Sequence, residues 1–195
     1  MAVTETIEGE PPLPAPAPGR RSTRNVVEWV AIVIGALAVA LIVKTFLIQA
    51  FFIPSLSMFS TLDKGDRVLV NKLSYHVHDI HRGDVVVFER PEALPDDGIK
   101  DLIKRVIGLP GDTIESRNGH VFVNGKQLKE SYLDDGVLTD SPVLERQTVP
   151  EHHIFVMGDN RSNSQDSRFF GPIDEDLVVG RAFIKVWPLT ELDLL

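Results

Sequence analysis

The stretch TIESRNGHVFVNGKQL, residues 113–128, places two Asn-Gly pairs between short runs of alternating apolar and polar residues. Both residues of an Asn-Gly pair readily adopt positive φ, which the tight two-residue turns of β-hairpins require. We therefore expect β-hairpins in this stretch, with turns at Asn118-Gly119 and Asn124-Gly125.

Outward from this stretch, short runs rich in valine and other strand-forming residues recur on both sides. They cover residues 67–73, 84–90, 153–158 and 181–187, and proline and glycine separate them. Beyond the N-terminal region the pattern indicates no long amphipathic helix, although a short one fits residues 171–178. We expect a mainly β fold, a largely antiparallel domain built as a folded sheet or a partly open barrel.

Length and composition narrow the class of protein. A chain of 195 residues suggests one domain with appendages, and a net charge of -8 gives no sign of a nucleic-acid footprint. The lack of cysteine excludes disulfides, thiolate zinc sites and cysteine nucleophiles. The acidic segment 132–152 has no clear hydrophobic period and is expected to be a surface excursion.

The first 47 residues differ in composition from the rest. Residues 1–25 are acidic, then proline-rich and finally basic, which predicts a disordered cytoplasmic tail. The apolar run that follows is long enough to cross a bilayer, so we expect a transmembrane helix over 26–47. Arginines precede the run, and the positive-inside rule therefore places residues 48–195 outside the cytoplasm. A cleaved secretory signal and a buried soluble helix are the alternative interpretations of this segment.

Ser57 lies in FFIPSLSMFSTL, residues 51–62, where hydroxyls stand among apolar residues directly after the expected span. A serine needs a base to act as a nucleophile, and most serines in loops only make local hydrogen bonds. Six histidines are present, but the group in HVHDIHRGD (76–84) is typical of a polar loop and completes no tetrahedral metal set. We therefore expect solvent-exposed histidines and no metal site.

Lys104, in DLIKRVIGLPGD (101–112), is the other candidate base. On a strand its same-face neighbours Leu102 and Val106 are apolar, and burial among apolar groups lowers the pKa of a lysine. The two-residue period of a strand does not decide whether Lys104 or Arg105 points inward, because Arg105 has equally apolar neighbours. Of the two, only the lysine can lose its proton and act as a base. A surface strand whose lysine extends into water is the alternative.

A third polar cluster, GDNRSNSQDSRFFG, covers residues 158–171. A calcium loop beginning at Asp159 is excluded, because a ligand position would fall on Arg161 and the closing carboxylate position on Phe170. So dense a polar loop favours an internal hydrogen-bond network. Within it, Asp166 and Arg168 are placed to pair on one side of an extended segment.

Together and in this order, four separated motifs resemble those of bacterial type I signal peptidase (leader peptidase), a family of serine proteases with a Ser-Lys dyad. The motifs are IPSLSM (53–58), GDVVVFERP (83–91), IKRVIGLPGD (103–112) and GDNRSNSQDSRFFG (158–171), all behind an N-terminal anchor. The resemblance extends from the anchor to about Trp187. It implies a signal-peptidase-like, largely antiparallel β catalytic domain, in agreement with the strand pattern.

The resemblance also implies roles for individual residues. Ser57 matches the nucleophile of the family and Lys104 its general base, while the Ser55 hydroxyl and the backbone N–H of Ser57 match the oxyanion hole. Ser164 matches the serine whose hydroxyl orients the lysine amine. The acidic and basic residues that support the site are matched by Asp159, Asp166 and Arg168.

Two further expectations concern the neighbourhood of Ser57. Phe52 and Ile53 are candidate walls of two shallow substrate pockets that accept only small side chains. Ser60 departs from the family, which has proline at this position. Proline there shapes the backbone and does not react, so we expect a looser turn with the chemistry intact.

The function implied is removal of N-terminal signal peptides from secreted preproteins at A-x-A-like sites on the outer face of the cytoplasmic membrane. The expected partners are preproteins and the lipid bilayer, with the chain a single-pass monomer that needs no cofactor. A maturation peptidase with a narrow client, and a catalytically silent membrane-anchored relative, are the alternatives.

Overall fold

The computed structural model describes residues 21–43, 47–95, 98–139 and 142–195. The chain divides into two compact units, and the boundary lies between Leu41 and Ile42.

The first unit contains the helix α1 (Arg21–Ile42) except for its last residue. No helix in the described part of the chain is both long enough and apolar enough to cross a bilayer. Residues 1–20 of the expected tail, and residues 44–46 of the span expected over 26–47, lie outside the described residues. The tail and the span therefore stay predictions.

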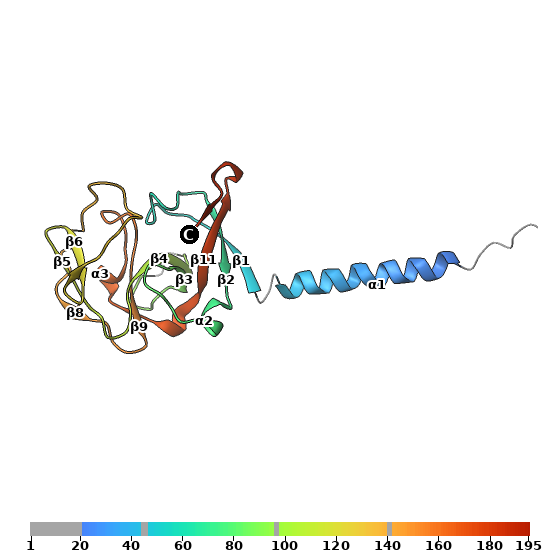
Figure 1. Cartoon of the computed structure of the whole chain (residues 1–195), viewed down its shortest axis with the longest axis horizontal. Helices are drawn as coiled ribbons and strands as arrows, with labels where there is room; N and C mark the ends of the chain where they lie inside the picture. The colour runs from blue at the N-terminus through green and yellow to red at the C-terminus, as the bar shows by residue number, and fades with distance from the viewer. Residues whose placement is uncertain (1–20, 44–46, 96–97, 140–141) are drawn as a thin grey trace, which may run out of the picture. The chain divides into compact units, whose positions relative to one another are not determined.

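The second unit is built mainly of short strands (Figure 1). Its helical segments are single turns of three or four residues among the described residues. In chain order the elements are β1 (Ile48–Phe52), β2 (Arg67–Asn71), α2 (Ser74–Val77), β3 (Val85–Glu89), β4 (Asp101–Gly108), β5 (Thr113–Arg117), β6 (His120–Val123), β7 (Lys126–Gln127), β8 (Gln147–Thr148), β9 (His153–Met157), α3 (Ser167–Phe170), β10 (Ile173–Asp174), η2 (Glu175–Leu177), β11 (Val178–Trp187), η3 (Leu189–Glu191) and β12 (Asp193–Leu194).

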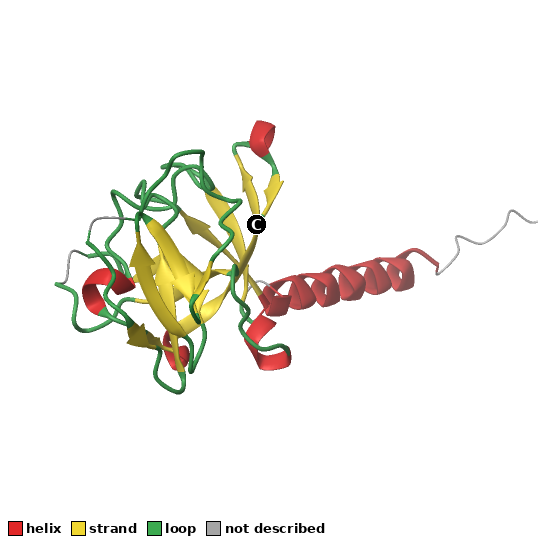
Figure 2. Cartoon of the chain, turned by 60° about the vertical axis from the view of Figure 1, so that its left-hand side comes forward, coloured by secondary structure: helices red, strands yellow, loops and turns green. Residues whose placement is uncertain are grey.

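The strands form two antiparallel sheets. The larger has the order β1-β2-β11-β3-β4-β9-β10, and β12 pairs with β11 beside this path. The smaller has the order β7-β6-β5-β8. Strong twist bends the larger sheet, as Figure 2 shows, because each strand carries the right-handed twist of an L-amino-acid chain. The mainly antiparallel β domain predicted from the sequence is confirmed.

The two Asn-Gly turns are confirmed as the hairpin turns of the smaller sheet. Asn118 and Gly119 have φ of 51° and 78°, and Asn124 and Gly125 have φ of 52° and 75°. Arg117 pairs with His120 across the first turn, so its loop has only the two residues of the Asn-Gly pair.

The strand β4 lies between β3 and β9 and is buried on both faces. Every residue from Ile103 to Gly108 is buried, because apolar clusters cover both sides of the strand. Ile103 packs in a cluster with Met58, and Val106 packs in another with Ile154. The side chains of Lys104 and Arg105 are therefore withdrawn from water.

The interpretation of residues 132–152 as a surface excursion is wrong for part of the segment. Leu144 and Val149 belong to the apolar cluster that also contains Ile114 of the smaller sheet, and Thr139 is 1% exposed. The described acidic residues of the segment face water, and so do Leu138 and Val143, whereas Thr139, Leu144 and Val149 face inward. Composition averaged over the segment concealed this division.

Candidate active site

Ser57 lies in the turn that follows β1, and apolar anchors hold that turn in place. Met58 and Leu62 are buried in the same cluster as Ile103 of β4, and the N–H of Leu62 donates to the carbonyl of Met58 at 2.7 Å. This packing presses Ser57 against β4, where its exposure falls to 9%. Lys104 Nζ lies 2.6 Å from Ser57 Oγ.

Lys104 is 3% exposed and sits opposite Val86 of β3 in the strand register. Burial in these surroundings is the main influence on its amine and lowers the pKa of Lys104 to about 8, although Asp166 and Asp159 oppose the shift. The Nζ also donates to the carbonyl of Ile103 at 2.9 Å. The alternative of a surface lysine that extends into water is excluded.

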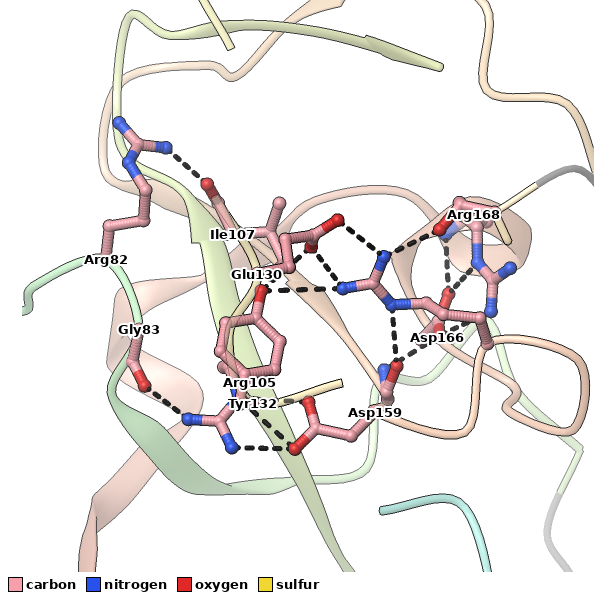
Figure 3. A network of polar contacts seen from close by, with 12 residues as sticks. Arg82, Gly83, Arg105, Ile107, Glu130, Tyr132, Asp159, Asp166 and Arg168 are labelled. Atoms are coloured by element: carbon pink, nitrogen blue, oxygen red, sulfur yellow. Dashed lines mark hydrogen bonds and ion pairs between the residues drawn. The ribbon is translucent and has the colours of Figure 1, made fainter. Parts of the chain in front are cut away.

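Arg105 is buried as well, at 7% exposure, so both members of the Lys-Arg pair point into the protein, on opposite faces of β4. Its NH2 donates to Asp159 Oδ2 at 2.7 Å, and the Tyr132 ring lies 4.0 Å from its guanidinium carbon (Figure 3). Asp159 also accepts a 2.6 Å hydrogen bond from Thr61 Oγ1, in the turn that carries Ser57. Arg105 and Asp159 thus connect this turn to β4.

The expected pairing of Asp166 with Arg168 is confirmed. Arg168 Nε donates to Asp166 Oδ1 at 2.8 Å, and both side chains are almost completely buried. Asp166 Oδ2 accepts the N–H of Gly158 at 2.9 Å, so the ion pair holds both ends of the polar loop together. The predicted hydrogen-bond network of residues 158–171 is therefore present.

Gly158 fills a site where there is no room for a side chain. A Cβ there would lie 2.3 Å from the carbonyl oxygen of Ser57 and 2.2 Å from Ser164 Oγ. Real Cβ contacts do not become this short, so the backbone of the polar loop approaches the Ser57 turn as closely as only glycine permits. The polar loop and the Ser57 turn therefore have one fixed spacing.

Ser164 lies beside this contact, but it does not make the hydrogen bond that the resemblance implied. Its Oγ is buried and has no hydrogen-bond partner among the described residues. Leaving a buried hydroxyl without a partner costs about 1–3 kcal/mol. The structure brings Ser164 to the site without the expected contact to Lys104.

The remaining predicted residues are less closely engaged. Ser55 is exposed, and its Oγ lies 3.4 Å from Ser57 Oγ, which is long for a hydrogen bond between hydroxyls. Phe52 is 58% exposed, whereas Ile53 is buried in the apolar cluster. Their contact with a substrate stays a prediction.

A cavity of about 240 Å³ opens beside Ser57 and Lys104. Its walls combine apolar side chains with polar ones, and neither Phe52 nor Ile53 is among its lining residues. The lining comprises Ser55, Leu56, Ser57, Arg90, Leu94, Ile99, Leu102, Lys104, Asn163 and Gln165.

Ser60 has a φ of 69°, in the left-handed region. Proline is fixed near −65° and cannot occupy this conformation. Ser60 thus gives the turn a backbone path that proline forbids, and the expectation of a looser turn with the chemistry intact stays a prediction.

Sequence reasoning missed a group of residues around Arg161, which is 1% exposed. Glu130, Tyr132 and Thr139 surround its guanidinium. The only sequence signal for Arg161 was its position within the dense polar loop of residues 158–171. Nothing in the local pattern singled out the other three residues, which lie at least 22 residues away.

Comparison with known proteins identifies the family to which the chain belongs. The family model described as signal peptidase, peptidase S26, matches residues 26–187. A probable signal peptidase I-2 of Synechocystis sp. is 40% identical over 163 residues, which cover 82% of this chain and 72% of the relative. The signal peptidase I of Leptolyngbya laminosa is also 40% identical, with 80% and 77% covered. A signal peptidase IB of Staphylococcus aureus is 36% identical, with 86% and 93% covered. The chain therefore belongs to the signal peptidase family, peptidase S26.

Proposed function

We propose that Ser57 and Lys104 form the catalytic dyad with which this chain removes signal peptides from secreted preproteins. Membership of the family makes the chain a serine endopeptidase of the signal peptidase I type. The observation that carries the residue assignment is the 2.6 Å approach of Lys104 Nζ to Ser57 Oγ. Burial supports it further, since a lysine with a pKa of about 8 is neutral often enough to accept a proton.

In the first half of the proposed reaction, the neutral amine of Lys104 takes the hydroxyl proton of Ser57 while Oγ bonds to the scissile carbonyl carbon. The C–N bond of the tetrahedral intermediate then breaks, and the protonated amine gives its proton to the leaving nitrogen. In the second half, Lys104 takes a proton from water as the water oxygen attacks the acyl-enzyme. Ser57 leaves with that proton, and the signal peptide is released as a free acid.

The backbone N–H of Ser57 and the Ser55 hydroxyl are proposed to bind the oxyanion of each tetrahedral intermediate. Support for Ser55 comes from its position, 3.4 Å from the attacking oxygen, with a hydroxyl free to rotate towards a substrate. Removing one oxyanion donor typically lowers the rate about 10²–10³-fold.

Ser164 is proposed to orient the lysine amine once a substrate is bound. Its buried hydroxyl is available for this role because it has no hydrogen-bond partner among the described residues. Asp159, Asp166 and Arg168 are proposed as supporting residues, since their ion pairs fix the two ends of the loop that carries Ser164.

The proposed cleavage sites are A-x-A-like. The cavity beside Ser57, at about 240 Å³, is smaller than sites for drug-sized ligands and suits small side chains. Phe52 and Ile53 are retained as proposed pocket walls, on the assumption that the substrate adds as a β-strand beside the end of β1.

The finer location is also a proposal. Residues 26–47 would anchor a single-pass monomer in the cytoplasmic membrane, with residues 1–25 in the cytoplasm and 48–195 outside. The support is the apolar run in the sequence, with arginines on its N-terminal side.

The test uses the full chain in detergent, incubated with a secretory preprotein, followed by sequencing of the new N-terminus. Cleavage after an A-x-A-like site is expected for the wild type, and none for Ser57→Ala or Lys104→Arg. Ser60→Ala, which removes a neighbouring hydroxyl, serves as the control and should cleave. A Lys104→Arg enzyme with wild-type activity would refute the dyad, and cleavage restricted to one client would favour the specialised maturation peptidase.

A further inference from the structure

The segment between β7 and residue 139 contributes three side chains that converge on Arg161 of the polar loop. Glu130 accepts from both terminal nitrogens of Arg161, with NH1 to Oε2 at 3.2 Å and a shorter contact from NH2 to Oε1. Thr139 Oγ1 accepts from NH1 at 2.6 Å. Planar, bidentate contacts of this kind are both strong and geometrically specific.

The third nitrogen of Arg161 faces the active site. Its Nε donates to the carbonyl of Gly158 at 3.1 Å, and the N–H of Asn160 donates to the carbonyl of Ser57 at 3.1 Å. Gly158 is the residue whose close approach sets the spacing between the polar loop and the Ser57 turn. The carboxylate of Glu130 is thus linked to the carbonyl of Gly158 through one guanidinium.

Tyr132 links the same carboxylate to the other buried arginine. Its hydroxyl donates to Glu130 Oε1 at 2.8 Å, while its ring lies on the guanidinium of Arg105 at 4.0 Å. Burial, with Glu130 as a second cause, raises the pKa of Tyr132, so the hydroxyl stays a donor at physiological pH. Glu130 therefore organises both arginines that border the polar loop.

We propose that Glu130 is a positioning residue for cleavage by Ser57 and Lys104, and that it acts by holding Arg161 against the backbone of the polar loop. Without this carboxylate, the buried charge of Arg161 is drawn towards Asp159, the other carboxylate acting on it. The carboxylate of Asp159 is then shared between the guanidinium groups of Arg161 and Arg105. Its bond to Thr61 loosens, and the Ser57 turn shifts relative to Lys104.

The inference rests on the proposed function of the dyad, and it is tested with the full chain in detergent and a preprotein substrate. Glu130→Gln keeps the shape of the side chain and removes its charge, and we expect kcat to fall by about 10- to 100-fold with KM changed by less than about 2-fold. Glu130→Asp restores the charge on a shorter side chain and should recover part of kcat.

A matched control is available on β5 of the smaller sheet. Glu115 forms an ion pair with Arg117 at 3.2 Å, and Arg117 is half exposed. Glu115→Gln therefore removes the same kind of charge from an arginine that water already solvates, and kcat should stay at the wild-type value.

Thr139→Val offers a second route to the same arginine. It removes the 2.6 Å bond to Arg161 and preserves side-chain volume, and we expect a smaller fall in kcat with KM unchanged. Because both changes act through Arg161, their effects in the double variant should not add. If Glu130→Gln fails to give folded protein by circular dichroism, Glu130→Asp and Thr139→Val decide the question by the same measurement.

A folded Glu130→Gln or Thr139→Val enzyme with wild-type kcat would overturn the proposal, as would a change confined to KM, which would assign the segment to substrate binding. Failure of the dyad itself is recognised separately. In that case Ser57→Ala or Lys104→Arg retains activity, whatever the result at Glu130.

Discussion

Lowering the pH should switch the enzyme off by charging Lys104. A lysine with a pKa of about 8 is neutral in about half of the molecules at pH 8, in about a tenth at pH 7 and in about a hundredth at pH 6. A lysine with an ordinary pKa would be neutral in fewer than about 1% of molecules at pH 8. Burial therefore raises the reactive fraction at that pH by about 100-fold.

The assay is kcat/KM for a signal-sequence peptide between pH 5.5 and 9.5, at constant ionic strength, with the full chain in detergent. We expect a single acid limb with a slope of one, so that the rate falls about tenfold for each pH unit below about 7. Enzyme incubated at each pH and then returned to pH 8 should recover its full rate, which separates titration from denaturation.

Asp166→Asn adds a directional check. Asp166 is the leading charge that raises the pKa of Lys104, so its neutralisation should move the acid limb to lower pH, even where the maximal rate falls. A profile that stays flat down to pH 6, or a limb that moves to higher pH in Asp166→Asn, would refute the lysine base.

Substitutions at four positions test the surroundings of the dyad. Gly158→Ala should lower kcat by at least about 10-fold, because its Cβ meets the backbone of Ser57 at 2.3 Å. The Cβ of Gly108→Ala would meet the buried side chains of Ile114 and Val149 and not the backbone of the Ser57 turn, so this variant should lower the melting temperature and spare kcat. Equal kcat in the two variants would contradict this expectation. Ser164→Ala removes a buried hydroxyl that has no hydrogen-bond partner among the described residues, so a thermal melt should show stability unchanged or higher by about 1 kcal/mol, while kcat falls. A loss of stability would show that the hydroxyl does have a partner. Ser60→Pro should destabilise the protein by more than about 1 kcal/mol in denaturant unfolding, because proline cannot adopt the positive φ of Ser60, whereas Ser60→Gly should not. A proline variant as stable as the wild type would disprove the left-handed conformation of Ser60.

The strands could be predicted from the sequence because their signals are local. Asn118-Gly119 and Asn124-Gly125 form hairpin turns by their own backbone preferences, so no distant contact was needed to place them. The valine-rich runs marked β2, β3, β9 and much of β11 for the same reason.

The site was only partly predictable. On β4, the alternation of apolar and polar residues does not predict which side chains are buried, because the strand is covered on both faces and buries Lys104 and Arg105 alike. Lys104 was selected only because its amine, unlike a guanidinium, can lose a proton. The contact between Glu130 and Arg161 joins residues 31 positions apart and leaves no periodic trace. For Ser164, the sequence motif predicts that a hydroxyl lies at the site but does not predict its hydrogen-bond partner.

The buried amine of Lys104 also has a consequence for the thermal robustness of the enzyme. The pKa of this amine is about 8 in the folded chain, against an ordinary value above 10 in the unfolded chain, so the unfolded state binds more protons between these two values. Stability from this residue therefore increases with pH across that window. Below about pH 8 the folded protein carries the full cost, about 3 kcal/mol, of keeping a cation away from water. The group that makes peptide cleavage possible is thus a built-in weak point of the fold, greatest at neutral and acidic pH.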